Sequence, residues 1–460
     1  MFAIPGTLAL IAFIYVRPQE VFTGLQRLPL LYLFFALAIF GLVVDLRLRV
    51  SRPRLVPQMP WVIALYLWSV LTVAINAPQV LTDRAIEIAI PVILFVVIAH
   101  SVQSFRTLQV VAAMLLALVI FLAALGVQQG NAEWGCLQLD PSGPKDLSTG
   151  HPDGRACSTD RMCYGGDAAP GADYACERIG LLGTTSVGHG RVRYRGVLQD
   201  PNELALTIGL GLALMLAFFD RKKSAKRGLF LVLTFVLVLV CVMYTESRGG
   251  QLVFLTVIGA YFVRRYGWRG GVAGLLVALP VLLLAGSGER HDATSSTDER
   301  METLYTGIDI FRSSPLIGVG EGQFTEYNYL TAHNSYLLAA AELGIVGFFL
   351  FASVLYISIK IPLLALRRYA GRPDAAVAAT WAMALLALLA GLYIGSFFLS
   401  FTWHHVLWIH LGLSGALYSA IRTHDPEFTV RYGALDMVGV GAFCAILLPF
   451  LFVYLRLEGV

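Results

Sequence analysis

The sequence predicts an all-α membrane protein, a polytopic transmembrane bundle of about 12 to 13 helices with two longer external loops. Composition is the first reason: of 460 residues, 57% are hydrophobic and 14% are charged, whereas a soluble domain carries roughly 25% charged residues. The second reason is that apolar runs follow one another along the whole chain, with polar residues in short clusters between them. The third is the placement of the basic residues, which favours one side of the membrane.

The apolar runs give the expected spans in order, because a bilayer core takes about 20 apolar residues per helix. They lie near residues 1–16, 29–45, 59–77, 86–100, 108–128, 198–219, 228–245, 250–263, 270–286, 334–359, 375–400, 405–421 and 433–456. The runs at 86–100 and 250–263 are short, so re-entrant or interfacial segments are possible there. The first run lacks the basic start and cleavage site of a signal peptide, and we expect it to remain as a helix.

The basic residues orient the bundle, because Lys and Arg beside a span resist translocation. Four connections carry clusters of them and alternate consistently as cytoplasmic: Arg47/Arg49/Arg52/Arg54, Arg221/Lys222/Lys223/Lys226/Arg227, Arg264/Arg265/Arg269 and Lys360/Arg367/Arg368/Arg372. Arg17 and Arg27 then fall outside, against the usual bias. The formal net charge of +4 is spread over these clusters and gives no indication of a nucleic-acid partner. Membrane lipids are the expected surroundings.

We expect five parts along the chain. They are N-terminal transmembrane helices at 1–128, a cysteine-containing periplasmic loop at 129–197, central transmembrane helices at 198–286, a second periplasmic loop at 287–333 and C-terminal transmembrane helices at 334–460. In the second loop, Met301, Leu304, Ile308 and Phe311 recur at helical spacing and predict an amphipathic helix. We expect this helix to lie on the membrane surface.

The first external loop contains an even set of cysteines, Cys136, Cys157, Cys163 and Cys176. Disulfides persist outside the cytoplasm, so two are predicted, with three pairings possible. A zinc site is the competing interpretation, but the spacings are long and irregular, and we expect no metal there.

The point where the chain re-enters the membrane is a candidate anion site. Asp200 and Glu203 fit a helix start, and the plain interpretation of Asp-Pro-Asn-Glu is helix capping. Capping does not require basic residues, yet Arg191, Arg193 and Arg195 lie directly upstream. An anion near this helix end would gain from the guanidinium groups and from the helix dipole.

Two further arginines are candidates. Arg248 lies in a tight external turn, where its charge opposes the usual bias and a bound phosphate would compensate it. A snorkelling arginine paired with Glu246 is the alternative interpretation. Arg300 opens the amphipathic helix and gains nothing from its dipole, whereas Arg312 closes the same helix, where an electrostatic role suffices.

Histidines and one intramembrane acid complete the set. His333 directly precedes a long apolar run, where a helix dipole favours the neutral imidazole and leaves it available as a base, although a structural role is the plain alternative. Glu342 lies within that run, where a carboxylate is costly and usually paired or functional, and it could hold one of the arginines. His404 and His405 occupy another external turn and could border the same cavity or anchor the interface.

Together these motifs resemble the O-antigen ligase and polymerase superfamily, which includes bacterial protein O-oligosaccharyltransferases. The matching pieces are Arg195-Gly196 followed by Asp200-Pro201-Asn202, then Ser247-Arg248-Gly249-Gly250, Pro315-Leu316-Ile317-Gly318-Val319-Gly320-Glu321-Gly322, His333-Asn334-Ser335-Tyr336-Leu337 and Glu342-Leu343-Gly344-Ile345-Val346-Gly347. Their order and topology fit the family over most of the chain. Val16-Arg17-Pro18-Gln19-Glu20 also looks like the O-glycosylation ligases associated with exosortase systems.

The resemblance implies an inverting, C-type glycosyltransferase of the bacterial inner membrane. It would take glycan from a polyprenyl (undecaprenyl) pyrophosphate on the periplasmic side, without a metal ion or other cofactor. By motif position, Arg248, Arg300 and His333 look like the catalytic residues. The residues expected to bind the pyrophosphate are Arg191, Arg193, Arg195, Arg248 and Arg300, and the supporting residues are Asn202, Glu321 and Glu342.

The acceptor stays open at this point. A ligase uses lipid A-core, a polymerase uses another lipid-linked glycan, and a protein glycosylase uses a protein hydroxyl; we favour the first and third over the polymerase. A transporter or flippase of lipid-linked glycan is the alternative from another class. Transporters usually show internal repeats and sites near the midplane, whereas these candidates cluster at external helix ends. A scaffold without chemistry would leave Arg248, Arg300 and His333 unexplained.

Overall fold

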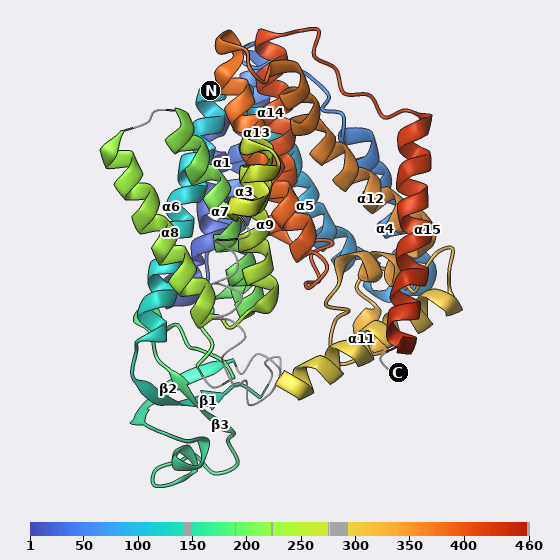
Figure 1. The fold of residues 1–460 in the computed structure, drawn as a ribbon. Coiled ribbons are helices and arrows are strands. Elements are labelled where there is room, and N and C mark those ends of the chain that lie inside the picture. The colour runs from blue at the N-terminus through green and yellow to red at the C-terminus, as the bar shows by residue number, and fades with distance from the viewer. Residues whose placement is uncertain (142–148, 189, 222–223, 275, 277–292, 458–460) are drawn as a thin grey trace.

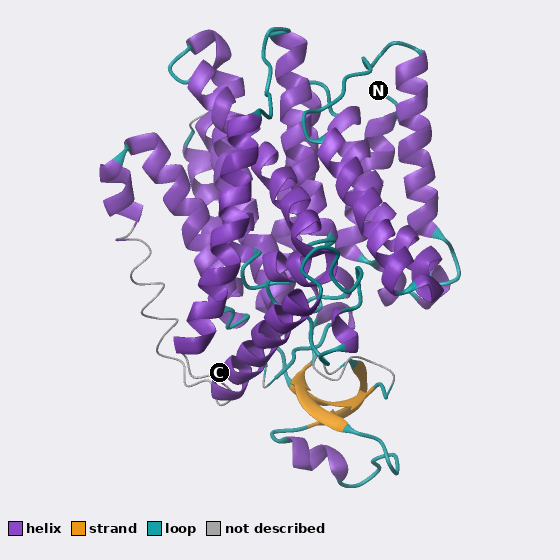
Figure 2. Ribbon diagram, turned by 90° about the vertical axis from the view of Figure 1, so that its right-hand side faces the viewer, coloured by secondary structure: helices purple, strands orange, loops and turns teal. Residues whose placement is uncertain are grey.

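The computed structural model describes the chain except residues 142–148, 189, 222–223, 275, 277–292 and 458–460. Helices dominate the described part, and a small three-stranded sheet extends from one end of the bundle (Figures 1 and 2). The predicted all-α transmembrane bundle is confirmed. The sheet inside the cysteine-containing loop is an addition that the sequence had not indicated.

The α-helices follow one another in a simple order along the chain. They are α1 (Ala3–Val16), α2 (Pro18–Val21), α3 (Leu30–Arg47), α4 (Met59–Asn76), α5 (Leu81–Ser101), α6 (Phe105–Gly130), α7 (Pro201–Arg221), α8 (Ala225–Tyr244), α9 (Arg248–Tyr266), α11 (Ala293–Ser313), α12 (Ser335–Tyr369), α13 (Ala376–Gly395), α14 (His405–His424) and α15 (Ala434–Leu457). Short 3-10 helices are η1 (Thr23–Leu25), η2 (Pro78–Val80), η4 (Asp160–Tyr164), η5 (Leu181–Gly183), η6 (Gly196–Leu198), η7 (Phe324–Glu326) and η8 (Pro373–Ala375).

Among the described residues, eight helices are long and apolar enough to cross a membrane, namely α3, α4, α6, α7, α8, α12, α13 and α15. The two runs that looked short, 86–100 and 250–263, belong to α5 and α9, which have 21 and 19 residues. Both pack among the other helices, α5 on α14 and α9 on α7 and α13. The expected run at 270–286 lies largely outside the described residues.

The polar connections divide between the two ends of the bundle. At one end, Arg54 Nη1 donates to Thr423 Oγ1 at 2.9 Å, and Arg265 lies 3.5 Å from Asp220. Arg372 lines a cavity with these last two residues. The sheet and α11 lie at the other end (Figure 1). The described residues of the basic connections predicted to be cytoplasmic and of the two long loops predicted to be external therefore occupy opposite ends.

The first hairpin shows how small residues allow close helix packing. A Cβ on Gly6 would lie 2.7 Å from the backbone nitrogen of Ala38, and a Cβ on Gly41 would lie 2.6 Å from Ala3 Cα. Small residues let transmembrane helices approach in this way, since no hydrophobic effect drives their association in lipid. The backbone N–H of Ala3 also donates to the buried Asp45 carboxylate at 3.0 Å, which satisfies an open donor at the start of α1.

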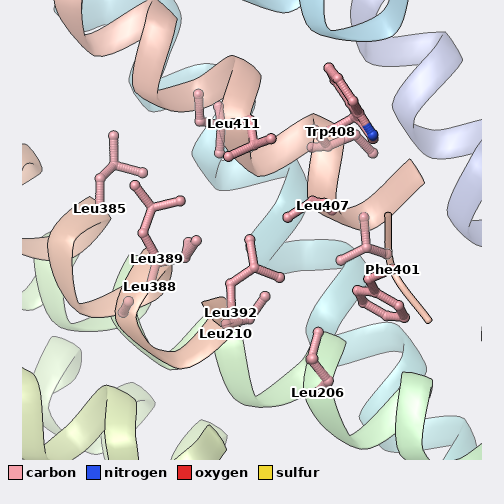
Figure 3. Close-up of a cluster of buried hydrophobic side chains, with 14 of the residues drawn as sticks. Leu206, Leu210, Leu385, Leu388, Leu389, Leu392, Phe401, Leu407, Trp408 and Leu411 are labelled. Atoms are coloured by element: carbon pink, nitrogen blue, oxygen red, sulfur yellow. The ribbon is translucent and has the colours of Figure 1, made fainter. Parts of the chain in front are cut away.

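Large apolar side chains fill the centre of the bundle between α7, α13 and α14. Leu206 and Leu210 of α7 lie beneath a row of leucines from α13, and Trp408 and Leu411 of α14 close the cluster from above (Figure 3). Leu210 and Trp408 are fully buried. This packing lies beside the starts of α7 and α14, next to the candidate residues Asn202 and His404.

The sheet has the strand order β2 (Gly150–Ala156), β1 (Trp134–Leu139), β3 (Tyr174–Arg178), all antiparallel. The predicted pair of disulfides is present, and the open pairing is Cys136–Cys163 with Cys157–Cys176. Both disulfides are buried against Tyr174 in a core of their own. All four thiols are consumed in this way, which does not fit the competing zinc interpretation.

Candidate functional site

A chain of hydrogen bonds joins the first turns of α7 and α9. Asp200 Oδ1 accepts from the backbone N–H and the Nδ2 of Asn202, at 2.7 and 2.8 Å. Asn202 Oδ1 in turn accepts from Ser247 Oγ at 2.6 Å. Ser247 caps α9 by accepting from the backbone N–H of Gly250 at 2.9 Å. Asn202 therefore links the first turns of α7 and α9, and Arg248 follows directly as the first residue of α9.

Arg191 lies against this link. Its Nε donates to the backbone carbonyl of Thr245 at 3.1 Å, which fixes the side chain beside the turn before α9. Its buried Nη2 has no hydrogen-bond partner among the residues that the structure describes. Burial lowers the pKa of Arg191, and the carboxylates of Asp200 and Glu246 oppose that shift. A buried cation with an unused N–H is suited to an anionic ligand.

Arg300 belongs to the same group of charges. Burial lowers its pKa most; the charges of Arg191 and Arg248 lower it further, and the Asp200 carboxylate raises it. Arg191, Arg248 and Asp200 therefore all lie within electrostatic range of Arg300, although these residues come from three separate parts of the sequence. We call Arg191, Arg248 and Arg300 the arginine cluster.

The other two arginines of the upstream triplet have different surroundings. Arg193 Nε donates to the backbone carbonyl of Thr185 at 2.9 Å, within the first external loop. Arg195 donates through Nη1 to the Glu20 carbonyl at 2.5 Å and through Nη2 to the Leu182 carbonyl. Both guanidinium groups hold loop segments together, so the structure brings only Arg191 of this triplet into the cluster.

A cavity of about 540 Å³ opens beside the cluster. Arg300 and His333 lie in its wall, together with Leu252, which lies one helical turn after Arg248. The remaining lining is mostly apolar and comes from α11, α13 and α15 with their flanking residues: Met301, Leu304, Ile394, Phe397, Phe398, Phe450, Leu451 and Tyr454. We call it the α11–α15 cavity. Its polar groups and long apolar walls suit an amphiphilic molecule.

His333 occupies a strained position beside this cavity. Its φ of 46° is in the left-handed region, which costs a non-glycine residue roughly 1–2 kcal/mol. Its backbone N–H donates to Ser400 Oγ at 3.0 Å. The next residue, Asn334, caps α12 by accepting from the N–H groups of Tyr336 and Leu337. The cap is therefore made by Asn334, and His333 lies in the wall of the cavity.

Glu342 does not hold one of the cluster's arginines, contrary to the expectation from sequence. Its Oε1 accepts from the backbone N–H of Phe324 at 3.2 Å, and its carbonyl accepts from the N–H of Gly320 at 2.9 Å. The glycine-rich segment thus folds against α12. Gly344 interrupts α12 with a φ of 66°, and any side chain there would overlap the carbonyl of Leu316. The motif glycines are explained by this close packing.

Glu321 belongs to the same glycine-rich segment and is also buried. Burial raises its pKa to about 7, while Arg84 opposes this shift and Glu87 adds to it. Glu321 and Glu342 affect each other electrostatically and form an acidic pair near the start of α5. The structure gives neither of them a place in the wall of the α11–α15 cavity.

Of the two alternatives for the histidines at the last external turn, the structure does not support a place at the border of this cavity. His404 Nε2 lies 2.8 Å from the Val197 carbonyl, and His404 Nδ1 accepts from the N–H of Val406 at 3.3 Å. Since a carbonyl only accepts, Nε2 carries the proton. Burial lowers the pKa of His404 to about 3, so the ring is neutral and structural. Neither it nor His405 lines the α11–α15 cavity.

Fold and site together define a multi-pass membrane protein with buried cationic groups at one end of its bundle. Residues 233–352 match the family model described as O-antigen ligase. The matched stretch runs from α8 into α12 and contains Arg248, Arg300 and His333. The resemblance drawn from the motifs is confirmed over this stretch. No match to a curated protein was found.

Proposed function

We propose that this chain transfers a glycan from a polyprenyl pyrophosphate to an acceptor hydroxyl, as an O-antigen ligase does. The observation that carries the proposal is that Arg300 and His333 line one largely apolar cavity, with Arg191 and Arg248 beside Arg300. A polyprenyl chain would lie along the apolar walls towards α15. Its pyrophosphate would then reach the arginine cluster.

The chemistry follows from the charges. As the acceptor oxygen bonds to the anomeric carbon, the bond from that carbon to the pyrophosphate oxygen breaks, and negative charge develops on the departing phosphate. Fixed guanidinium groups stabilise this charge through short, charge-assisted hydrogen bonds. Arg248 and Arg300 take this role, with Arg191 supplying its unused N–H. Inversion at the anomeric carbon is the expected outcome of a single displacement.

His333 is proposed to take the proton of the attacking hydroxyl. A general base must lie within hydrogen-bond reach of that proton, and His333 shares the cavity with the group that would bind the leaving pyrophosphate. Its left-handed backbone supports this role, since strain of this kind persists where a side chain must be aimed at a site. The neutral imidazole accepts the proton and returns it to solvent after transfer.

The proposed location is the bacterial inner membrane with the site on the periplasmic side. Basic connections gather at the opposite end of the bundle, and basic connections favour the cytoplasm. The disulfides belong to the same end as the site, and disulfides persist outside the cytoplasm.

The test uses purified protein in nanodiscs with a polyprenyl-pyrophosphate glycan, EDTA and candidate acceptors. Release of polyprenyl pyrophosphate is measured for wild type, Arg248→Ala, Arg300→Ala and His333→Ala. Arg312→Ala is the matched control, because Arg312 lies on the same helix as Arg300 but packs over Phe452. We expect acceptor-dependent release that survives EDTA, falls at least 100-fold in the three variants and persists in the control.

The acceptor that supports release identifies the subclass: lipid A-core for a ligase, a protein hydroxyl for a glycosylase and lipid-linked glycan for a polymerase. Folded protein that consumes no donor with any acceptor, yet moves labelled lipid-linked glycan across a bilayer, would replace the proposal by a transporter.

A further inference from the structure

The segment Val16 to Glu20 has no part in the proposed chemistry, yet it packs against the chain that leads to the site. Tyr194 OH donates to the Val16 carbonyl at 2.7 Å, and Arg195 Nη1 donates to the Glu20 carbonyl at 2.5 Å. These contacts join residues 175 or more positions apart in the sequence. They place the turn after α1 directly against the segment that enters α7.

The closest approach in this interface is between Arg17 and Gly196. Gly196 has a φ of +55°, and a Cβ there would overlap Arg17 Nε. The guanidinium group therefore lies directly against the glycine, with Nε 3.4 Å from Glu20 Oε1. Arg17 itself ends α1 in the left-handed conformation, with a φ of 51°. Glycine is the usual residue at such a helix end, so an arginine here indicates that its side chain is needed.

A second side chain also holds the same segment. His404 Nε2 bonds to the Val197 carbonyl at 2.8 Å, one residue beyond Gly196. The segment then reaches Asp200 and Asn202, whose hydrogen bonds end on Ser247, the cap of α9. Arg17 and His404 thus contact consecutive residues, Gly196 and Val197, of a segment that continues to the hydrogen bonds at the start of α9.

We propose that Arg17 is a positioning residue for pyrophosphate binding, acting through Gly196 and the Asp200–Asn202–Ser247 link on Arg248. This inference rests on the proposed function, because it assumes that the arginine cluster binds pyrophosphate. The physical reason is rigidity: a binding group must be held within about 0.5 Å of its productive position. A shift of the segment at Gly196 moves Asn202 and, through Ser247, the first turn of α9.

The experiment measures the affinity of nanodisc-embedded protein for farnesyl pyrophosphate by isothermal titration calorimetry. We expect Gly196→Ala to weaken binding about tenfold, because the methyl group displaces the guanidinium group and the segment together. Arg17→Ala should weaken binding by about three- to tenfold. Both changes disturb the same contact. The double variant should therefore bind farnesyl pyrophosphate no more weakly than whichever single variant has the lower affinity. Arg17→Lys should remain weakened, because lysine keeps the charge but lacks the planar group.

A melting-temperature series separates this effect from general loss of stability. Arg178→Ala is the control: Arg178 packs over Trp134 and bonds to the Ala132 carbonyl in the sheet loop, so its loss should lower stability and leave affinity unchanged. Multiplicative effects in the double variant, full affinity in Gly196→Ala, or wild-type affinity in Arg17→Lys would each overturn the inference. If Arg248→Ala also binds normally, the proposed function fails instead.

Discussion

Arg191 and Arg193 are two positions apart, but their guanidinium groups have different surroundings. Arg191 keeps an unused, buried N–H beside Asp200 and Arg300, whereas Arg193 bonds to the backbone and side chain of Thr185. On an extended segment, residues two positions apart point to the same side. Simple alternation therefore does not explain why Arg191 and Arg193 have different surroundings, and the turns of this loop account for the difference.

The first prediction compares these two arginines. Arg191→Ala should weaken binding of farnesyl pyrophosphate about 10- to 100-fold, since hydrogen bonds to charged groups contribute about 1.5–3 kcal/mol. Arg193→Ala should lower the melting temperature and leave the affinity unchanged. Titration calorimetry and thermal unfolding of both variants check this. Equal affinity losses in the two variants would contradict the assignment of Arg191 to the cluster.

The second prediction concerns the pH dependence of stability. Burial raises the pKa of Glu321 to about 7, so the folded protein keeps a proton that the unfolded chain loses near its ordinary pKa of about 4.3. The contribution of Glu321 to stability is complete below that ordinary pKa and is lost as the pH rises through about 7. Each pH unit between these values corresponds to about 1.4 kcal/mol at most.

Glu321→Gln should therefore gain thermal stability over wild type as the pH is raised from about 5 to 8. Melting temperatures in detergent across this range measure the difference. Glu326→Gln is the control, because Glu326 is exposed on the same loop and its replacement should leave the pH profile nearly unchanged. Parallel profiles for wild type and Glu321→Gln would refute the prediction.

Among the elements, α12 shows how one residue can shape a helix and a loop together. The break at Gly344 lets the segment after α11 lie against α12, where the Ile345 N–H donates to the Pro315 carbonyl at 2.8 Å. Residues 315–324 lie between α11 and His333 in the chain, so this contact also holds the spacing between Arg300 and His333. A continuous helix would leave the segment without these backbone partners.

The third prediction follows from this break. Gly344→Ala places a side chain in a conformation reserved for glycine and against the Leu316 carbonyl, so we expect a loss of about 2–4 kcal/mol in stability. Gly259→Ala in α9 is the control, because nothing lies within 4 Å of a Cβ there, and alanine favours the helix by up to about 1 kcal/mol. Chemical unfolding in detergent compares the two variants. Similar free energies of unfolding for Gly344→Ala and Gly259→Ala would contradict the prediction, because they would mean that the backbone at the α12 break can adjust to a side chain.

At the scale of the whole molecule, the sheet and the bundle are stabilised by different interactions. The sheet is too small for a large apolar core, and its centre is made of disulfides and Tyr174. Each disulfide closes a loop with a sequence separation of 27 or 19 residues, which corresponds to about 3–4 kcal/mol of unfolded-state entropy. The transmembrane helices share none of these bonds.

The fourth prediction is that reduction unfolds the sheet and spares the bundle. Replacement of all four cysteines by serine should make residues 134–178 sensitive to protease while the far-UV helical signal stays within about 10% of wild type, because the sheet's stability depends on these links. Limited proteolysis and circular dichroism measure the two effects. Loss of the helical signal in the same four-cysteine variant would show that the sheet and the bundle unfold together.

The fifth prediction concerns orientation. In sealed spheroplasts, an impermeant maleimide should label Glu326→Cys and should label Arg372→Cys only after lysis. Both positions are exposed and lie at opposite ends of the bundle, and Cys241 and Cys444 are buried. The reverse labelling pattern would contradict the positive-inside orientation and place the arginine cluster on the cytoplasmic side.

Sequence alone was sufficient for the membrane class, for most helices and for the family resemblance. Hydropathy and helix-start patterns act over ten to twenty neighbouring residues, so the residues that decide them are adjacent in the chain. The basic character of Arg248 and Arg300 and the position of His333 before a helix were visible for the same reason. The even cysteine count likewise predicted two disulfides, although three pairings stayed open.

The tertiary structure decided which of these residues meet. It places Arg191 apart from Arg193 and Arg195. It also brings Glu342 into contact with the glycine-rich segment and Arg17 into contact with Gly196. Each of these choices depends on contacts between segments far apart in the sequence, which no local pattern records. The one available signal was the positive charge of Arg17 at the end where basic residues are disfavoured. Its cause is a close packing contact, because only the folded chain brings residues 17 and 196 together.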